Sequence, residues 1–317
     1  MLTAIDSWAR RWAAAPPWTN VYGLARSMLA LATLVTFVFS DVTSLFCPAS
    51  GLLEVPMCSG IRGAGLFCLV GAHHLGVARV LVILVLLAVL AGYRPRITGV
   101  LHWFVTVSFH LNATMLDGGD QLTADLVLVL VPVTLTDPRV WHWDAPPANS
   151  GVFSRFVASA ALTMARLQMA GVYFHAATAK FAVPEWTDGT ALYYIFLHPT
   201  VGVAGWLAAP VRFLVTNAIT LPLLTWSVLV LELCLTAAIL CGRRRRKQLL
   251  AAGLLFHGGI ILFHGLVSFG LAMCAGLVLY LWPADEVFDL APVRRLARTL
   301  RSGLSSLVPR QRAGAGS

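Results

Sequence analysis

A lysine at the end of a long apolar segment is the residue best placed to do chemistry in this sequence. Only two lysines occur in 317 residues, and Lys180 is the one that lies outside the basic run 243–247. An amine inside a membrane costs roughly 2.5–3.5 kcal/mol at a helix centre, so its presence indicates a functional group. The same amine near a helix end can instead extend to the membrane surface as an anchor. The sequence leaves both interpretations open.

The spacing of polar residues around Lys180 predicts a helix inside a bundle. Arg166, Tyr173 and Lys180 are seven residues apart, so they share one face of a helix. At 1.5 Å per residue, Arg166 lies about 21 Å from Lys180, toward the inner half of the membrane, with Lys180 near the outer boundary. Gln168 and His175 form a second polar line. Such a helix cannot face lipid on all sides.

Other polar residues are expected to converge on this lysine. Those predicted at its depth are His110, Asn112, Asp117, Asp120 and His264. Glu232 lies near the middle of another apolar segment, and a buried carboxylate needs a partner, for which Arg166 is the candidate.

Each of these residues also has a purely structural interpretation. Asp117 and Asp120 flank two glycines, a composition that suits a tight turn. His257 and His264, seven residues apart, are favoured as hydrogen-bonding residues between helices over ligands. A structural ion pair explains Glu232 as well as a functional one does.

Composition places these residues in a membrane. Hydrophobic residues make up 58% of the chain and charged residues 12%, about half the usual charged fraction of roughly 25%. Long apolar runs with so few charges indicate an integral membrane protein whose first partner is the lipid bilayer. The net charge of +9 therefore does not indicate nucleic-acid binding.

The apolar runs predict an all-α bundle of about eight transmembrane helices with additional interfacial helices. The predicted spans are 22–40, 77–92, 97–114, 119–136, 154–180, 216–241, 249–266 and 268–283. The last two share few residues, so a single tilted helix over 249–283 stays an alternative. The first span lacks a clear cleavage site and is expected to be retained.

Charge then orients the bundle. With both termini in the cytoplasm, 17 of the 23 Lys and Arg residues lie on the inner side, as the positive-inside rule requires. We therefore expect a cytoplasmic segment over 1–20, a membrane domain over 21–285 and a basic cytoplasmic tail over 286–317. The expected location is the bacterial cytoplasmic membrane, crossed several times.

Three cysteines are expected on the outer side, in the loop 41–76. Cys47 and Cys58 are the candidate disulfide, which leaves Cys68 unpaired. The spacing of Cys and His predicts no metal site. Phosphate-binding loops, a nucleophile elbow and tandem repeats are also not found in the sequence.

The segment around Lys180 resembles a known superfamily. An aromatic-rich stretch over 173–181 ends at Lys180 and is followed by Trp186 and Gly189 within 184–194. This pattern is similar to the HTTM superfamily, membrane proteins related to vitamin K-dependent γ-carboxylase. The stretches 20–26 and 118–122 are most similar to its SdpB branch, the sporulation-delaying proteins. The resemblance covers most of residues 18–285.

The resemblance implies roles for particular residues. Lys180 would be the base that deprotonates vitamin K hydroquinone in the carboxylase, although the cofactor of this chain stays unknown. The resemblance assigns Lys180 alone; with the polar residues expected near it, the candidate catalytic set is Lys180, Tyr173, His110, Asp120 and His264, and the candidate substrate-binding set is Trp186, Asp117, Arg166 and Glu232. The carboxylase's large outer domain is not expected here, and Gly119-Asp120 replaces its Asn-His element. Glutamate carboxylation is therefore not expected.

Three functions stay open at this point. The first is an SdpB-like role in maturation or export-linked processing of a small secreted peptide toxin, with a separately encoded SdpA-like partner. The second is a quinone- or lipid-dependent, carboxylase-like membrane enzyme with Lys180 as general base. The third is a structural membrane protein without catalysis. The sequence does not decide whether a reaction occurs.

Overall fold

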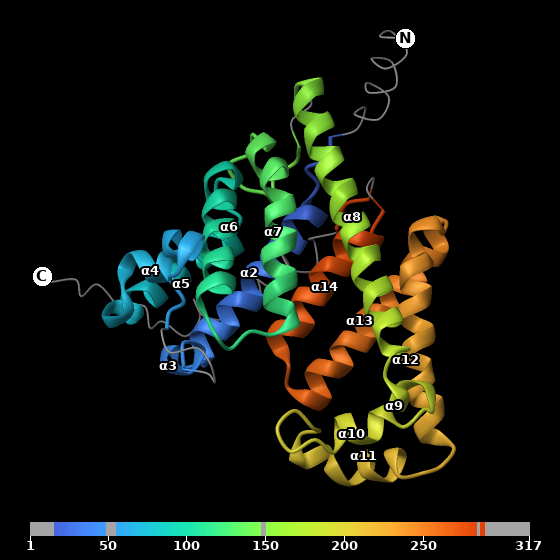
Figure 1. Ribbon diagram of the computed structural model, residues 1–317. Helices are drawn as coiled ribbons and strands as arrows, with labels where there is room; N and C mark the ends of the chain where they lie inside the picture. Colours follow the sequence, from blue (N-terminus) through green and yellow to red (C-terminus); the bar gives the residue numbers. More distant parts are fainter. Residues whose placement is uncertain (1–15, 49–54, 147–149, 284–285, 289–317) are drawn as a thin grey trace, which may run out of the picture. The chain divides into compact units, whose positions relative to one another are not determined.

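A computed structural model describes residues 16–48, 55–146, 150–283 and 286–288 (Figure 1). Within these ranges the regular structure is helical, apart from one antiparallel bridge between Tyr93 and Trp141. A helix occupies each segment predicted to span: α2 (Asn20–Phe39), α5 (Leu75–Ala91), α6 (Pro95–Asn112), α7 (Gly118–Thr136), α8 (Val152–Lys180), α12 (Thr220–Ala237), α13 (Arg243–His264) and α14 (Val267–Leu281).

The chain divides into two compact units between Glu286 and Val287, and all of these helices belong to the first unit. Most of the predicted cytoplasmic segment 1–20 and of the basic tail 286–317 lies outside the described residues.

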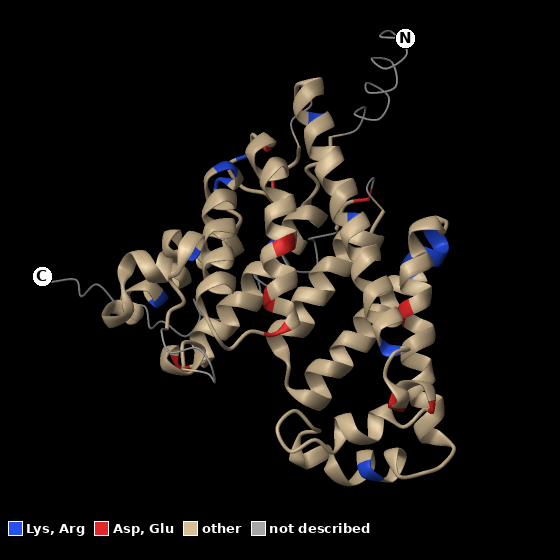
Figure 2. Cartoon of the chain, in the orientation of Figure 1, with Lys and Arg blue, Asp and Glu red and all other residues tan. Residues whose placement is uncertain are grey.

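Five of the helical segments are long and apolar enough to cross a membrane: 20–39, 72–91, 118–136, 220–240 and 243–264. Large apolar side chains such as Leu84, Val230 and Leu255 are more than half exposed on these helices. Exposed apolar surface of this extent suits lipid rather than water. In Figure 2, tan covers most of each helix, and blue gathers near helix ends. The crossing of all eight segments, and their orientation, stay predictions.

The shortest of these helices, α14, lies at the centre of the bundle. It packs against α2, α7, α8 and α13, and nearly all of its side chains from Ala272 to Leu281 are buried. Small residues allow this approach, since a Cβ at Gly276 would meet the Met169 side chain at about 2.5 Å. The segment 249–283 forms two helices, α13 and α14, and not the single long helix that was the alternative prediction. The chain breaks at Gly265, whose φ of +71° favours glycine.

Helix α13 begins at Arg243, six residues before the predicted start of the span. The basic run therefore forms its first turns, because arginine and lysine are good helix formers. Arg246 donates to the carbonyls of Ala238 and Ile239, at the end of the preceding helix. Cations stabilise such unpaired C-terminal carbonyls.

Short helices fill the loop between α2 and α5, predicted on the outer side, and the loop between α8 and α12. The first loop holds α3 (Val42–Leu45), η1 (Gly60–Ala64), α4 (Leu66–Val70) and η2 (Ala72–His74). The second holds α9 (Pro184–Thr187), α10 (Ala191–Phe196), η3 (Gly205–Leu207) and α11 (Ala208–Val215). This second loop caps one end of α12 and α13 (Figure 1). The Ala204 amide, for example, donates to the Phe263 carbonyl over 2.8 Å.

The predicted pairing of Cys47 with Cys58 is wrong. Cys58 is bonded to Cys68, with their Cα atoms 5.7 Å apart. The helices η1 and α4 turn the chain back on itself between these two residues, which brings them within disulfide range. Cys47 lies instead beside Thr114, whose hydroxyl donates to the Cys47 carbonyl over 2.8 Å.

Candidate functional site

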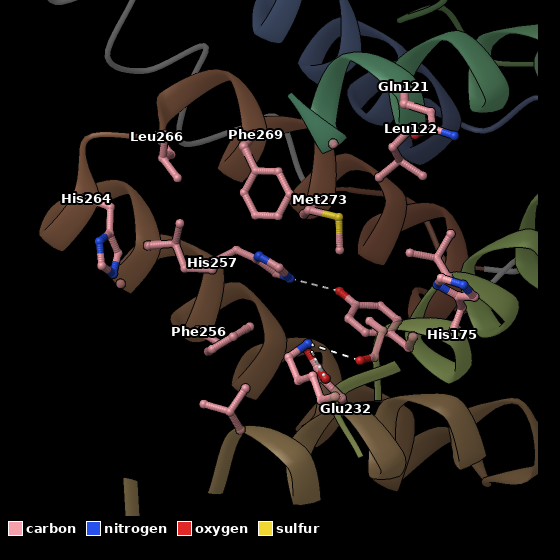
Figure 3. A pocket seen from close by; sticks show the side chains of 18 of the residues that line it. Gln121, Leu122, His175, Glu232, Phe256, His257, His264, Leu266, Phe269 and Met273 are labelled. Carbon is pink, nitrogen blue, oxygen red and sulfur yellow. Dashed lines mark hydrogen bonds and ion pairs between the residues drawn. The ribbon is translucent and has the colours of Figure 1, made fainter. Parts of the chain in front are cut away.

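A cavity of about 1150 Å³ lies within the membrane-type bundle. Side chains of α7, α8, α9, α10, α12, α13 and α14 line it, and most of them are apolar (Figure 3). Along α8 the lining extends from Met164 to Lys180, a length of about 24 Å. Small-molecule sites usually have volumes of about 300–1,000 Å³, so this cavity has room for an elongated ligand.

Lys180 forms an ion pair with Glu232 in the wall of this cavity. Its Nζ lies 2.8 and 2.9 Å from the two carboxylate oxygens and 3.2 Å from the Ala176 carbonyl oxygen. The ammonium also lies 5.2 Å from the centre of the Trp186 ring, a cation–π distance. Its three N–H bonds therefore all have acceptors, and Glu232 is buried.

The ion pair corrects the expected partner of Glu232 and shows where Lys180 lies along α12. Arg166 is not the partner of Glu232, because its Nε lies 3.4 Å from the Leu279 carbonyl, about 21 Å along α8 from Lys180. Glu232 lies twelve residues after Thr220, about 18 Å along α12. Lys180 thus lies beside the interior of α12, and its amine contacts a buried carboxylate. This contact favours a polar centre inside the bundle over a snorkelling anchor.

A second polar contact lies next to the ion pair. The Tyr173 hydroxyl and the His257 Nε2 are 3.0 Å apart, and both side chains are buried. Tyr173, Ala177 and Lys180 follow one another at helical spacing on the same face of α8. The Nδ1 atom of His257 has no hydrogen-bond partner in the described part of the chain. We call Tyr173, Lys180, Glu232 and His257 the cavity cluster.

A different buried polar cluster fixes the loop after α7. Arg139 donates two hydrogen bonds to the Asp137 carboxylate, at 2.8 and 2.7 Å, and another to the His142 carbonyl. The Nη1 atom of Arg26 lies 3.3 Å from Nδ1 of His142. Burial, together with the charges of Arg26 and Arg139, lowers the pKa of His142 to about 2. These four residues, the loop cluster, are not part of the cavity lining.

Comparison with known proteins gives two full-length relatives from Bacillus subtilis strain 168. The chain is 37% identical over 300 residues to the uncharacterized protein YitO, covering 93% of this chain and 96% of that protein. It is 34% identical over 274 residues to the sporulation-delaying protein SdpB, covering 85% of this chain and 83% of SdpB. The chain belongs to the SdpB family. No family model matches the chain, and no solved structure matches it.

In this SdpB-family protein, the cavity collects some of the predicted site residues and not others. Those that line it are Tyr173, Lys180, Trp186, Glu232 and His264. Those that do not are His110, Asp117, Asp120 and Arg166. His264 lies under the cap, where its Nδ1 is 2.8 Å from the Val201 carbonyl oxygen.

The two aspartates before α7 have structural contacts. The Asp117 carboxylate accepts hydrogen bonds from the amides of Gly119 and Asp120, at 2.7 and 2.9 Å. The Asp120 carboxylate accepts one from the Asp117 amide, which completes a capping box. Ser268 of α14 also donates to Asp117 over 3.2 Å. These contacts match the turn interpretation of the two residues and join α7 to α14.

Several polar residues of the cavity were not in the predicted set: Gln121, Asp125, Gln168, His175 and His257. Gln168 and His175 were visible as a second polar line on α8. Gln121 and Asp125 are four residues apart within an apolar run, which places both on one face of α7. A charged residue inside an apolar run is the signal that could have pointed to Asp125. Among the described residues, no group of three metal-type side chains is close enough together to hold an ion.

Proposed function

We propose that this SdpB-family chain is a multi-pass protein of the bacterial cytoplasmic membrane that takes part in maturing a small secreted peptide toxin. In this proposal the cavity cluster is the working site, and an SdpA-like protein is the separately encoded partner. The family relationship to a sporulation-delaying protein supports the biological role. The observation that carries the site is the ion pair between Lys180 and Glu232 at the cavity wall.

Stability alone is a poor explanation for this ion pair. A buried pair is often replaced by apolar residues at no loss of stability, because removing two charges from water offsets their attraction. Ionisable groups among transmembrane segments usually serve a ligand or a proton. Lys180 and Glu232 also border open volume rather than packed side chains. A function involving a ligand in the cavity accounts for both features.

The contacts of Lys180 define what a ligand must do there. All three acceptors of the ammonium belong to the protein, so a precursor carbonyl or carboxylate binds by taking the place of one Glu232 oxygen. The carboxylate released in this way can accept a proton or a hydrogen bond from the ligand. The site therefore binds and orients the precursor through exchange within the ion pair.

A second candidate function is a quinone- or lipid-dependent enzyme with Lys180 as base. The observation that favours it is the direct contact between the ammonium and Glu232. Transfer of one proton to the carboxylate would leave a neutral amine, and an apolar cavity favours uncharged groups. Arginine does not give up its proton, so Lys180→Arg separates the two candidates.

The test is toxin activity of the producing host on a sensitive lawn, at matched levels of membrane-inserted protein. We expect Lys180→Ala and Glu232→Gln to lower activity about tenfold or more, since a charge-assisted hydrogen bond contributes on the order of 1.5–3 kcal/mol. Lys180→Arg retains activity if the residue binds and abolishes it if the residue is a base. Arg212→Ala, on the exposed face of α11, is the control and should match the wild type. Full activity of both Lys180→Ala and Glu232→Gln would refute the proposed site.

A further inference from the structure

Besides the cavity cluster, two glutamines and an aspartate line the cavity. Gln121 and Asp125 come from α7, and Gln168 comes from the facing helix α8. Asp125 lies seven residues into α7, about 10 Å from its first residue. It is half-buried, and its carboxylate has no ion pair or hydrogen bond to any residue that the structure describes.

The charges of the lining residues do not balance. Lys180 contributes +1, Glu232 −1 and Asp125 −1, so the formal sum is −1 with the histidines neutral. Lys180 is occupied by Glu232, and Arg166 contacts the Leu279 carbonyl and does not line the cavity. An unpaired carboxylate among transmembrane helices is unfavourable, and such groups usually pair with a cation. The missing positive charge is thus expected on the ligand.

Two glycines add information about the shape of that ligand. A Cβ added at Gly171 of α8 would meet nothing within 4 Å, and one at Gly259 of α13 would touch only Phe263 of the same helix. Both glycines line the cavity. Small residues on facing surfaces let another helix backbone approach closely in a membrane. The length of about 24 Å along α8 corresponds to about sixteen residues of helix.

We infer that the cavity binds an apolar helical peptide segment that carries one basic side chain, and that this cation pairs with Asp125. The amide oxygens of Gln121 and Gln168 supply further acceptors for its N–H groups. The inference rests on the proposed function, because it identifies the occupant as a segment of the toxin precursor. In this inference Asp125 selects a ligand that carries a positive charge. The ion pair of Lys180 and Glu232 is a separate contact with the ligand.

The test measures binding by the purified full-length protein in maltoside micelles. The probes are three labelled sixteen-residue leucine–alanine peptides that differ only in a central Lys, Gln or Glu, followed by fluorescence anisotropy. We expect the Lys peptide to bind about tenfold more tightly than the Gln peptide, and the Glu peptide to bind most weakly. Asp125→Asn should remove this order, and Asp125→Glu should keep it.

Further experiments test whether the positive charge belongs to a peptide or to a lipid, and whether the peptide binds in the cavity. Gly171→Leu should weaken the binding of all three peptides, because the new side chain fills part of the cavity. Gly76→Leu on α5, also in open space, should leave their binding unchanged. Displacement of the Lys peptide by phosphatidylethanolamine as effectively as by unlabelled peptide would overturn the peptide assignment in favour of a lipid amine. Equal binding of the Lys and Gln peptides, or a preference that persists in Asp125→Asn, would overturn the role of Asp125.

The binding assay needs no toxin, so the two proposals fail separately. If Lys180→Ala and Glu232→Gln keep full toxin activity while Asp125 still selects the Lys peptide, the proposed function fails and the cation site stands. If Lys180→Ala and Glu232→Gln lose toxin activity while the peptides bind without charge preference, the proposed function stands and the Asp125 inference fails.

Discussion

The loop cluster and the cavity cluster bury similar chemical groups in different surroundings. In the loop cluster, a Cβ at Gly23 would lie within about 3 Å of the His142 ring, and one at Gly92 would collide with that ring. In the cavity cluster, the neighbouring glycines of α8 and α13 face open space. Protein atoms thus surround the first cluster completely, whereas the second has room for another molecule. The difference separates charges that hold the fold from charges that are available to a ligand.

The hydrogen bonds of the two clusters follow the same division. Arg139 contacts Asp137 and the carbonyls of His142 and Asp144, all within one short loop. The ion pair of the cavity cluster instead joins two helices, since Lys180 and Glu232 are 52 residues apart. We expect the first cluster to control stability and the second to control activity.

The largest effect on stability should follow from removing Arg139. Arg139→Ala leaves the fully buried Asp137 carboxylate without its partner, which lowers the free energy of unfolding by about 3–5 kcal/mol. Thermal unfolding in detergent measures the change. Arg96→Ala, on an exposed position of α6, is the control and should stay within about 0.5 kcal/mol of wild type. Equal melting temperatures for the two variants would end the structural interpretation of the loop cluster.

A smaller loss is expected from adding one methyl group at Gly92. Its φ of +88° is unfavourable for alanine, and the new Cβ would collide with the His142 ring, so Gly92→Ala costs about 2–4 kcal/mol. Gly76→Ala is a matched change in a helix with open space, and it should stabilise the protein by about 0.5–1 kcal/mol. Denaturant unfolding of both variants measures the difference. If Gly92→Ala were no less stable than wild type, the surroundings of His142 would have room for an added methyl group and the structural interpretation of the loop cluster would be contradicted.

The loop cluster should also make stability depend on pH. His142 has a pKa of about 2 in the folded protein and about 6.5 when unfolded, so below pH 6.5 the unfolded chain binds the additional proton. Stability therefore falls as pH decreases from 6.5 toward 2, by about 2 kcal/mol at pH 5. The measurement is the melting temperature between pH 7 and 5 for wild type and His142→Gln. The melting temperature of the variant should fall less between pH 7 and 5 than that of wild type. An equal fall in both proteins would contradict the claim that His142 is buried and neutral.

The smallest effect on stability, with a large effect on activity, is expected in the cavity. Gly259→Leu places a side chain in the cavity, while Gly258→Leu places one in open space outside the cavity. Both replace a helical glycine, so their free energies of unfolding should differ by less than about 0.5 kcal/mol. Toxin activity should fall only in Gly259→Leu. The same toxin activity in both variants would mean that no ligand needs the open space beside α13.

Sequence patterns predicted the helices well and their relative positions poorly. Apolar runs indicated a helix at every predicted span, because a run long enough for a membrane leaves few alternatives. The predicted partner of Glu232 was wrong because the depth of each residue in the membrane was measured from the ends of its own helix. The offset between α8 and α12 depends on the short helices α9 to α11, whose packing has no sequence signature. The disulfide was wrong for a related reason, since η1 and α4 bring Cys58 to Cys68.

For the candidate site, the i and i+7 spacing on α8 correctly grouped Tyr173 with Lys180. His110 and Asp120 were grouped with them only by assumed depth, and neither lines the cavity. Depth alone cannot distinguish the several faces of a bundle. The resemblance in the segment after Lys180 was more informative, because Trp186 lies 5.2 Å from the lysine ammonium.

The most direct test compares toxin activity per folded molecule in Lys180→Ala and Arg139→Ala. Folded protein is counted in membranes by size-exclusion of a fluorescent fusion, and activity is measured on a sensitive lawn. We predict that Lys180→Ala loses less folded protein than Arg139→Ala, because the Glu232 carboxylate borders the open cavity, and that it loses about tenfold or more of its activity per folded molecule. Arg139→Ala should lose folded protein and keep the activity of each folded molecule. Retained activity per molecule in Lys180→Ala, or an equal loss in both variants, would contradict the assignment of function to the cavity cluster.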